Sequence, residues 1–255
     1  MNGSDKIVYM IQYQVQGCAY EIRVNDFYID SSLQGLGGGN VVINNYIPHT
    51  GQQFLSFQML PLPGENKINE NSNIDICITR TIVDTANMSV VTPEPIMILE
   101  REKEQYSGIV EFYADIPYSI ILCSNSKKIS SDYNTVESLI GFYEELNILL
   151  KEKRGNELIS LLEFHENNQI KSLYWDIDED IRKQRNDDLW DLLTSECWLR
   201  MPGDDEICRL FGNGRAVRFV KPDGSPALTI CTKDDEYIMD WYFHIPEGKS
   251  KFCIL

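Results

Sequence analysis

The spacing of hydrophobic residues changes twice along this chain of 255 residues. Up to about Leu122, apolar residues alternate with polar ones at every second position, which is the period of a strand with one buried face. From Val136 to Cys197 they recur at every third and fourth position, as on amphipathic helices. After Ile207 the period of two returns. The pattern predicts strands, then helices, then strands again.

These changes of period define the predicted domains. Residues 1–123 are expected to form an antiparallel β-sandwich, and residues 134–255 an α+β domain of three helices followed by a four-stranded antiparallel meander. Residues 124–133 are small and polar and have no apolar period, which favours a linker. The predicted fold class is therefore mixed β and α+β.

A glycine-rich stretch at residues 35–40 interrupts the first series of strands. Glycines that lead into a helix can bind phosphate through the free amides of the first helical turn. Here the stretch leads into Val41-Val42-Ile43, which has the composition of a strand. We therefore interpret residues 35–40 as a flexible hairpin loop and not as a phosphate site.

Cap and turn residues give the expected ends of the later elements. Asn134 stands three residues before Glu137, a spacing typical of a helix N-terminus, and Gly155 is placed to end that helix. Asn156 is expected to cap a second helix, and a third is expected over residues 178–197. Turn residues then separate strands that are expected near residues 217–219, 228–230, 237–243 and 252–254.

The chain is strongly acidic, with 39 acidic and 23 basic residues and a formal net charge of −16. Such a surface repels a phosphate backbone, so a nucleic-acid partner is not expected. Residues 137–206 hold 18 acidic and 8 basic residues, more than half of this net charge. We interpret this segment as a contact surface for a basic protein partner, with a plain solvated surface as the alternative. The predicted contact residues are Glu144, Glu145, Asp187, Asp188 and Asp191.

Seven cysteines are scattered along the chain without a Cys-x-x-Cys pair. Their odd number and apolar neighbours are typical of free thiols in a reducing compartment. The first residues lack a basic region followed by an apolar one, and no run of about 18 apolar residues occurs. We therefore expect a cytoplasmic protein without a membrane partner.

No metal, cofactor or catalytic residue is predicted. The three histidines are not at the spacing of a zinc ligand set. A calcium loop that began at Asp176 would need a glycine at its sixth position and a glutamate at its twelfth, where the chain has Ile181 and Asp187. Acidic residues here favour the N-terminus of the expected third helix instead.

Two kinds of ligand site stay open as alternatives. One is a pocket for a small ligand or a reaction in the C-terminal domain, with Tyr237, Trp241 and His244 near its mouth. The other is an aromatic platform for a sugar on the N-terminal domain, where tyrosines and phenylalanines are dense.

Residues in both halves of the chain carry a family resemblance. They are residues 214–219 (GRAVRF), 222–228 (PDGSPAL), 20–26 (YEIRVND), 44–47 (NNYI) and 51–53 (GQQ). These strings resemble uncharacterised two-part bacterial proteins of the kind found among the immunity proteins of toxin delivery systems. The order of helices and then sheet is similar to the nuclear-transport-factor-2-like fold, a likeness of shape that implies no function.

The resemblance and the acidity lead to one functional hypothesis and one alternative. The hypothesis is a non-enzymatic bacterial immunity or inhibitor protein whose acidic helical segment neutralises a basic toxin domain. The alternative is the small-ligand or enzymatic pocket of the C-terminal domain.

Overall fold

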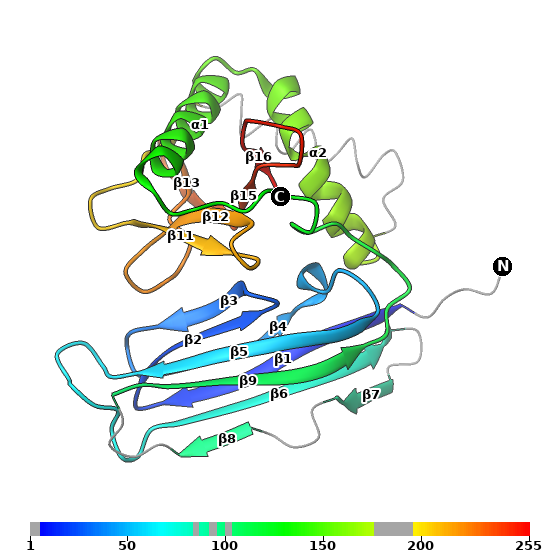
Figure 1. The fold of residues 1–255 in the computed structure, drawn as a ribbon, viewed down its shortest axis with the longest axis vertical. Coiled ribbons are helices and arrows are strands. Elements are labelled where there is room, and N and C mark those ends of the chain that lie inside the picture. The colour runs from blue at the N-terminus through cyan, green and yellow to red at the C-terminus, as the bar shows by residue number, and fades with distance from the viewer. Residues whose placement is uncertain (1–5, 84–86, 92–95, 100–103, 176–195) are drawn as a thin grey trace. The chain divides into compact units, whose positions relative to one another are not determined.

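The structure is a computed structural model that describes residues 6–83, 87–91, 96–99, 104–175 and 196–255 (Figure 1). Its contacts divide the chain into two compact units. Unit 1 comprises Met1–Ile120 with Lys171–Tyr174, and unit 2 comprises Ile121–Ile170 with Trp175–Leu255. The described elements are mostly antiparallel strands, with two α-helices. This confirms the prediction of a β-rich α+β class.

Unit 1 consists of two antiparallel sheets, with strand orders β4-β1-β6-β7, in which β8 also pairs with β6, and β3-β2-β5-β9. Its described elements are β1 (Ile7–Gln16), β2 (Ala19–Val24), β3 (Phe27–Ser32), β4 (Leu36–Val42), the 3-10 helix η1 (Asn44–Tyr46), β5 (Gly51–Leu60), β6 (Asn73–Ile82), β7 (Asn87–Val90), β8 (Ile96–Leu99) and β9 (Tyr106–Ala114).

Alternation along the strands of unit 1 places one side of each sheet in a shared core. Ile11 and Val15 of β1 are buried together with Leu55 and Phe57 of β5, although the two strands belong to different sheets. Complete burial of such a side chain contributes about 1.5–3 kcal/mol to folding. The period of two in the sequence therefore reflects the alternation of core-facing and outward-facing side chains along these strands.

The glycine-rich stretch is a strand and not the predicted flexible loop. Residues 36–42 form β4, which pairs antiparallel with β1. A Cβ atom on Gly37 would lie 2.0 Å from the Tyr20 hydroxyl oxygen, so glycine is needed here for space. The Tyr20 hydroxyl donates to Asp30 Oδ2 at 2.6 Å, and the Tyr13 hydroxyl donates to the same oxygen. Gly37 thus makes room for a partly buried polar cluster of Tyr13, Tyr20 and Asp30.

Unit 2 contains two antiparallel sheets, of orders β10-β13-β14 and β11-β12-β15-β16, and the helices α1 and α2. Its described elements are α1 (Tyr133–Lys151), α2 (Gly155–Ser172, whose last two residues are assigned to unit 1), β10 (Cys197–Arg200), β11 (Ile207–Phe211), β12 (Ala216–Val220), β13 (Thr229–Thr232), β14 (Glu236–Ile238), β15 (Phe243–His244) and β16 (Cys253–Ile254).

Helix α1 packs its apolar face against the core of unit 2. Leu139, Tyr143 and Leu146 recur at three and four residues and are buried. The ring of Tyr143 lies 5.2 Å from that of Phe243 on β15 and 5.6 Å from that of Phe219 on β12, measured between centroids. Tilted and edge-on ring pairs of this kind add about 0.5–1.5 kcal/mol beyond the burial of their area.

The ends of the helices differ from the prediction. Asp132, and not Asn134, caps α1, because its side chain accepts a hydrogen bond from the Thr135 amide at 2.9 Å while its own backbone is extended. Lys153 has a φ of +56° just after α1, and Gly155 begins α2 where it was expected to end the first helix. A left-handed residue after the last turn ends a helix, and here a lysine takes that conformation.

The predicted strand over residues 237–243 is two short strands in different sheets. Tyr237 on β14 pairs with Ile230 of β13, whereas Phe243 on β15 pairs with Val217 of β12. Between them Asp240 leaves the ladder and forms an ion pair with Arg218, which is fully buried on β12. A buried guanidinium requires a charged partner, and this requirement accounts for the break.

Two further predicted segments are the linker and the third helix. The expected linker, residues 124–133, lies within unit 2, where Ser126 forms a bridge with Pro246 and Ile129 is buried. The expected third helix, over residues 178–197, lies almost entirely outside the described residues. The likeness to the nuclear-transport-factor-2-like fold and the domain bounds stay predictions.

Candidate functional site

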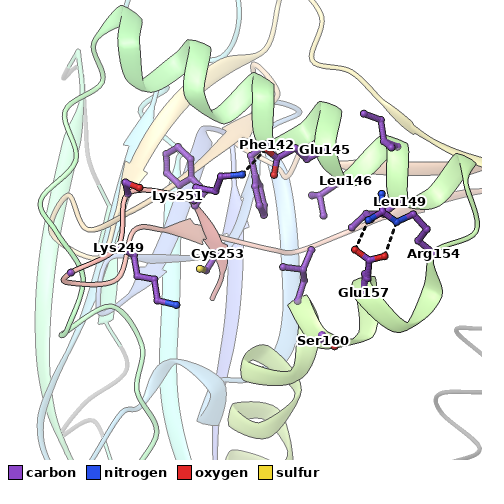
Figure 2. Close-up of a pocket in the computed structure, with 15 residues that line it drawn as sticks. Phe142, Glu145, Leu146, Leu149, Arg154, Glu157, Ser160, Lys249, Lys251 and Cys253 are labelled. Atoms are coloured by element: carbon purple, nitrogen blue, oxygen red, sulfur yellow. Dashed lines mark hydrogen bonds and ion pairs between the residues drawn. The ribbon is translucent and has the colours of Figure 1, made fainter.

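Unit 2 has an open groove of about 840 Å³ between α1, the first turns of α2 and the C-terminal segment (Figure 2). Three segments that are far apart in the sequence line it: residues 142–149, 154–161 and 248–253. Pockets that hold small molecules commonly have volumes of about 300–1,000 Å³ and a mostly apolar lining with a few polar groups. The groove matches both properties.

The floor of the groove is apolar because helical spacing brings the side chains together. Phe142, Leu146 and Leu149 lie three and four residues apart on one side of α1. Leu161 of α2 and Phe252 of the C-terminal segment complete this surface. Each of these side chains except Leu161 is buried, so the floor is continuous with the core of the unit.

The C-terminal segment forms one wall and is held in place by backbone pairing. Strand β16 pairs with β15, with Ile254 opposite Phe243, and the Leu255 amide donates to the Tyr242 carbonyl at 2.9 Å. Gly248 has a φ of +79°, which a turn before this strand requires. The Lys249 amide closes the turn by donating to the Pro246 carbonyl at 3.0 Å. Residues 248–251 are thereby presented at the edge of the groove.

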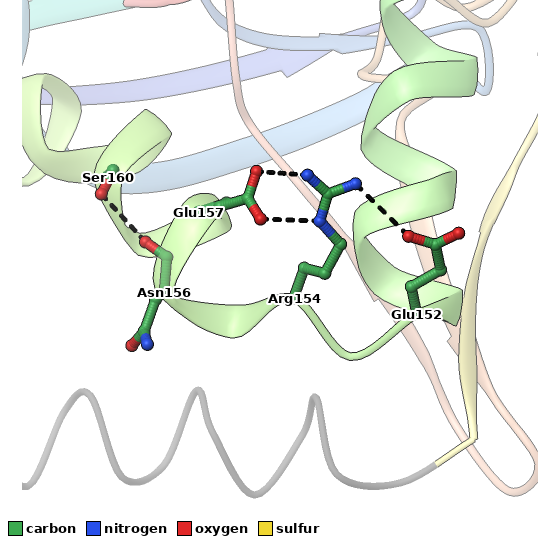
Figure 3. A network of polar contacts seen from close by, with 5 residues as sticks. All are labelled: Glu152, Arg154, Asn156, Glu157 and Ser160. Atoms are coloured by element: carbon green, nitrogen blue, oxygen red, sulfur yellow. Dashed lines mark hydrogen bonds and ion pairs between the residues drawn. The ribbon is translucent and has the colours of Figure 1, made fainter.

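An ion pair fixes the junction of the two helices (Figure 3). Arg154 donates from Nε to Glu157 Oε1 at 2.6 Å and from Nη2 to Glu157 Oε2 at 2.5 Å, and its Nη1 donates to Glu152 at 3.3 Å. The paired geometry lowers the pKa of Glu157 and raises that of Arg154. Both charges therefore persist at neutral pH and offset one another.

A second ion pair lies across the groove. Lys251 Nζ lies 3.1 Å from Glu145 Oε1, and both side chains are more than half exposed. Exposed pairs of this kind contribute only about 0–1 kcal/mol, so the pair can open at little cost. The pair connects α1 with the C-terminal segment at the rim.

Lys249 is the remaining charged side chain of the lining. Among the residues that the structure describes, no carboxylate lies within ion-pair distance of its ammonium group. Its charge acts on Cys253, a thiol of the lining: burial raises the pKa of Cys253, and Lys249 opposes this effect. Lys249 therefore places a positive potential inside the groove.

The titratable groups of unit 2 are in states that disfavour nucleophilic catalysis. Burial raises the pKa of Cys208 to about 11 and also raises the pKa of Cys197 and of Cys231. A thiol needs a lowered pKa to be reactive at neutral pH. Burial lowers the pKa of His244 to about 4, and its Nδ1 lies 2.6 Å from the Ser126 hydroxyl oxygen. Cys253 is the partner of His244 on the neighbouring strand β16, and burial raises the pKa of this thiol as well.

Only one of the predicted contact residues lines the groove. Glu145 lines the groove, and Glu144 is exposed on the same helix but is not part of the lining. Asp187, Asp188 and Asp191 lie outside the described residues.

The predicted pocket residues do not line the groove. Tyr237 is exposed on β14, Trp241 is buried in the core, and His244 is buried on β15 with its ring stacked 5.8 Å from that of Phe164. His244 is nevertheless the register partner of Cys253, which is part of the lining, whereas Tyr237 lies on a strand of the other sheet.

The aromatic platform for a sugar on unit 1 stays a prediction: Phe54 on β5 and Tyr113 on β9 are exposed, whereas other aromatic side chains fill the core. Tyr9, Tyr20, Phe27 and Phe57 are nearly completely buried. Aromatic side chains that fill a core are not available to stack on a ligand.

Sequence reasoning missed most of the groove. The sequence analysis predicts no role for Arg154, Glu157, Lys249 or Lys251, and it places Phe252 on a strand. One signal was present: residues 249–251 (KSK) concentrate positive charge next to an aromatic residue in a chain of net charge −16.

Comparisons with family models, curated proteins and solved structures found no match for this chain. The resemblance to immunity proteins therefore stays a prediction. Within the described residues, no helix is long and apolar enough to cross a membrane, and no group of three or more His, Cys, Asp or Glu side chains is placed to hold a metal ion.

Proposed function

We propose that this protein is a non-enzymatic binding protein that holds a small, largely apolar molecule in the groove of unit 2. The observation that carries the proposal is the groove itself: about 840 Å³, with an apolar floor and charged groups confined to its rim. The raised thiol pKa values and the buried His244 favour binding over catalysis.

Removal of the ligand's apolar surface from water provides the driving force for binding, together with burial of Ile148, which is exposed, and Leu161, which is partly buried, in the lining. Each methylene of a ligand that leaves water contributes about 0.8 kcal/mol, so a chain of several carbons suffices for measurable affinity. The floor belongs to packed elements, because Leu146 and Phe252 are part of the core. A preformed surface of this kind loses little conformational entropy when a ligand binds.

The test is the binding of Nile red, a neutral apolar dye whose emission reports its surroundings. Ser160 is exposed and lines the groove, so Ser160→Trp fills the groove without a change in the core. Glu163 is exposed on the same helix and is not part of the lining, so Glu163→Trp is the matched control. We expect wild type and Glu163→Trp to bind equally and Ser160→Trp to bind at least about tenfold more weakly, which corresponds to 1.4 kcal/mol.

Either of two results would overturn this proposal. One is the absence of dye binding to the folded wild-type protein. The other is equal affinity of the three proteins, since the dye would then bind elsewhere. Circular dichroism and thermal unfolding of each variant establish that a lost affinity does not reflect lost folding.

We also propose a second function, which is the binding of a protein partner through α1. One observation supports it. Glu144 and Glu145 are exposed next to one another on this helix, and Glu144 has no cation within ion-pair distance among the described residues. An uncompensated carboxylate at a surface favours a basic partner, as the toxin-neutralising hypothesis requires.

This second function is tested by charge reversal. The tagged protein is used to capture partners from its native lysate at low and moderate salt, in parallel with Glu144→Lys/Glu145→Lys and with the control Glu163→Lys. A stoichiometric partner that is lost with the double variant and with salt, and retained by the control, supports the contact. A partner that all three proteins retain excludes this surface.

A further inference from the structure

The charges of the groove do not cancel, although the chain as a whole is acidic. Three cations, Arg154, Lys249 and Lys251, line it, and two carboxylates, Glu145 and Glu157. The remainder of the chain carries the large negative excess. Because Glu152, outside the lining, also pairs with Arg154, the positive excess of the lining lies on the C-terminal segment, which carries Lys249 and Lys251.

The excess positive charge of the lining is located at Lys249. Glu157 is occupied by two hydrogen bonds from Arg154, and Glu145 pairs with Lys251. Lys249 is left without a carboxylate partner among the described residues, and its effect on Cys253 places its charge beside the apolar lining. The groove thus has an apolar floor on α1 and an uncompensated cation on the C-terminal segment (Figure 2).

We propose that the occupant of the groove is an amphipathic anion, with its apolar chain along the lining that Phe142, Ile148 and Leu161 share and its anionic head at Lys249. This inference rests on the proposed function and adds the chemical class of the ligand. Lys251 provides a second donor, because its exposed pair with Glu145 is weak enough to exchange for a ligand.

Long-range repulsion does not oppose this assignment at physiological salt. Charges more than about 8 Å apart in solvent are largely screened, whereas a head group in contact with Lys249 experiences its full local potential. Contact with the apolar floor also excludes water from one side of the pair, which strengthens the attraction. The net charge of −16 therefore affects the association rate more than the bound state.

The test compares ligands that share one apolar chain and differ in the head. Decanoate, decanol and decyltrimethylammonium carry a negative, a neutral and a positive head, and each is titrated against the Nile red complex. We expect decanoate to bind about two- to fivefold more tightly than decanol, which is the range for one contact with an exposed charge, and the cation to bind most weakly. Decyl phosphate, added as a fourth ligand, separates a phosphate head group from a carboxylate.

Matched variants assign the effect to Lys249. Lys249→Met keeps the length of the side chain and removes its charge, and Lys233→Met makes the same change at an exposed residue outside the groove. We expect the preference for decanoate over decanol to disappear in Lys249→Met and to persist in Lys233→Met. Glu145→Gln releases Lys251 and is expected to raise the affinity for decanoate about twofold or more.

The outcomes separate this inference from the proposed function. Equal binding of the three head groups, with binding still blocked by Ser160→Trp, overturns the anion assignment and leaves an apolar binding site. A preference for decanoate that survives in Lys249→Met overturns the role of Lys249. The absence of binding by any of these ligands overturns both proposals.

Discussion

His244 in unit 2 has a strongly lowered pKa, and its surroundings account for this shift. It lies on β15 with 6% of its surface exposed, its ring stacks on Phe164, and Nδ1 faces the Ser126 hydroxyl. A buried imidazole without a carboxylate partner disfavours the charged form, so its pKa falls to about 4. His244 is therefore neutral in the folded protein near pH 7.

This shift predicts a loss of stability in mild acid. Because the pKa is about 4 in the folded state and about 6.5 in the unfolded state, the unfolded state binds the proton first as the pH falls. The contribution of His244 is complete above about pH 6.5 and is lost progressively toward pH 4. Urea unfolding at pH 6.5 and pH 4.5 measures this loss. Between these two values we expect the free energy of unfolding to fall by about 2 kcal/mol more in the wild type than in His244→Asn.

The matched control is His49→Asn, since His49 is exposed. Its pH dependence is expected to run parallel to that of the wild type. Nuclear magnetic resonance of the wild-type imidazoles gives a second readout that does not depend on whether His244→Asn folds. Protonation of His244 near pH 6.5 in the folded protein would contradict the predicted environment.

At the scale of elements, the N-terminus of α1 allows the sequence prediction and the structure to be compared directly. The sequence assigns the cap to Asn134, whereas the structure assigns it to Asp132, whose carboxylate accepts from the Thr135 amide and from the Ser130 hydroxyl. These hydrogen bonds lower the pKa of Asp132. The Ser138 hydroxyl donates to the Asn134 carbonyl four residues earlier. Asn134 therefore lies inside the helix and not at its cap.

We therefore expect Asp132→Ala to lower the melting temperature and Asn134→Ala to leave it nearly unchanged. Loss of a cap from a protein of this size lowers the midpoint of thermal unfolding by about 2–4 °C. Differential scanning calorimetry at neutral pH provides the measurement. A larger effect of Asn134→Ala would restore the cap that the sequence suggests.

Glycines provide a second comparison at this scale, because two of them have opposite surroundings. A Cβ atom on Gly141 of α1 would meet nothing within 4 Å, whereas one on Gly108 of β9 would lie 2.5 Å from the ring of Phe57. Gly141→Ala is expected to stabilise the protein by about 0.5–1 kcal/mol, and Gly108→Ala to destabilise it by about 1–3 kcal/mol. Urea unfolding of both variants measures the difference, and a change of the same sign in both would contradict the described packing.

The elements also show which features the sequence determines. Periodicity predicts the strands of unit 1 and both described helices, because burial of one face imposes the period directly. It does not predict β4, because the need for glycine at position 37 comes from Tyr20, which packs there only in the folded protein. It also does not predict the division of residues 237–243, where Asp240 pairs with Arg218 of another strand. The sequence does not predict the groove for the same reason: Lys249 and Phe142 line one groove only after β15 and β16 pair.

At the scale of the whole molecule, the seven cysteines share one state. All seven are free thiols, and burial raises the pKa of each of the five that shift, to about 11 in Cys18 and Cys208. Cys123 is buried, and Cys77 is only partly buried. Free thiols distributed over both units indicate that the fold needs no covalent crosslink.

This state predicts slow alkylation of the native protein. Because the thiolate is the nucleophile, a rise of two pKa units lowers its population at neutral pH by about a hundredfold. We expect iodoacetamide to modify native Cys208 about a hundred times more slowly than the same residue in urea, with all seven cysteines modified after unfolding. Mass spectrometry of peptides from timed samples gives the rate for each residue.

Cys253 makes this measurement informative about function, because it is the thiol that lines the groove. Burial raises its pKa although Lys249 opposes the shift, so slow alkylation agrees with a site that binds and does not react. Decanoate is expected to slow the alkylation of Cys253 further and to leave Cys208 unaffected, because only Cys253 is in the groove. Alkylation of Cys253 faster than that of an unfolded thiol would instead indicate an activated nucleophile, and a catalytic role for the groove would then replace simple binding.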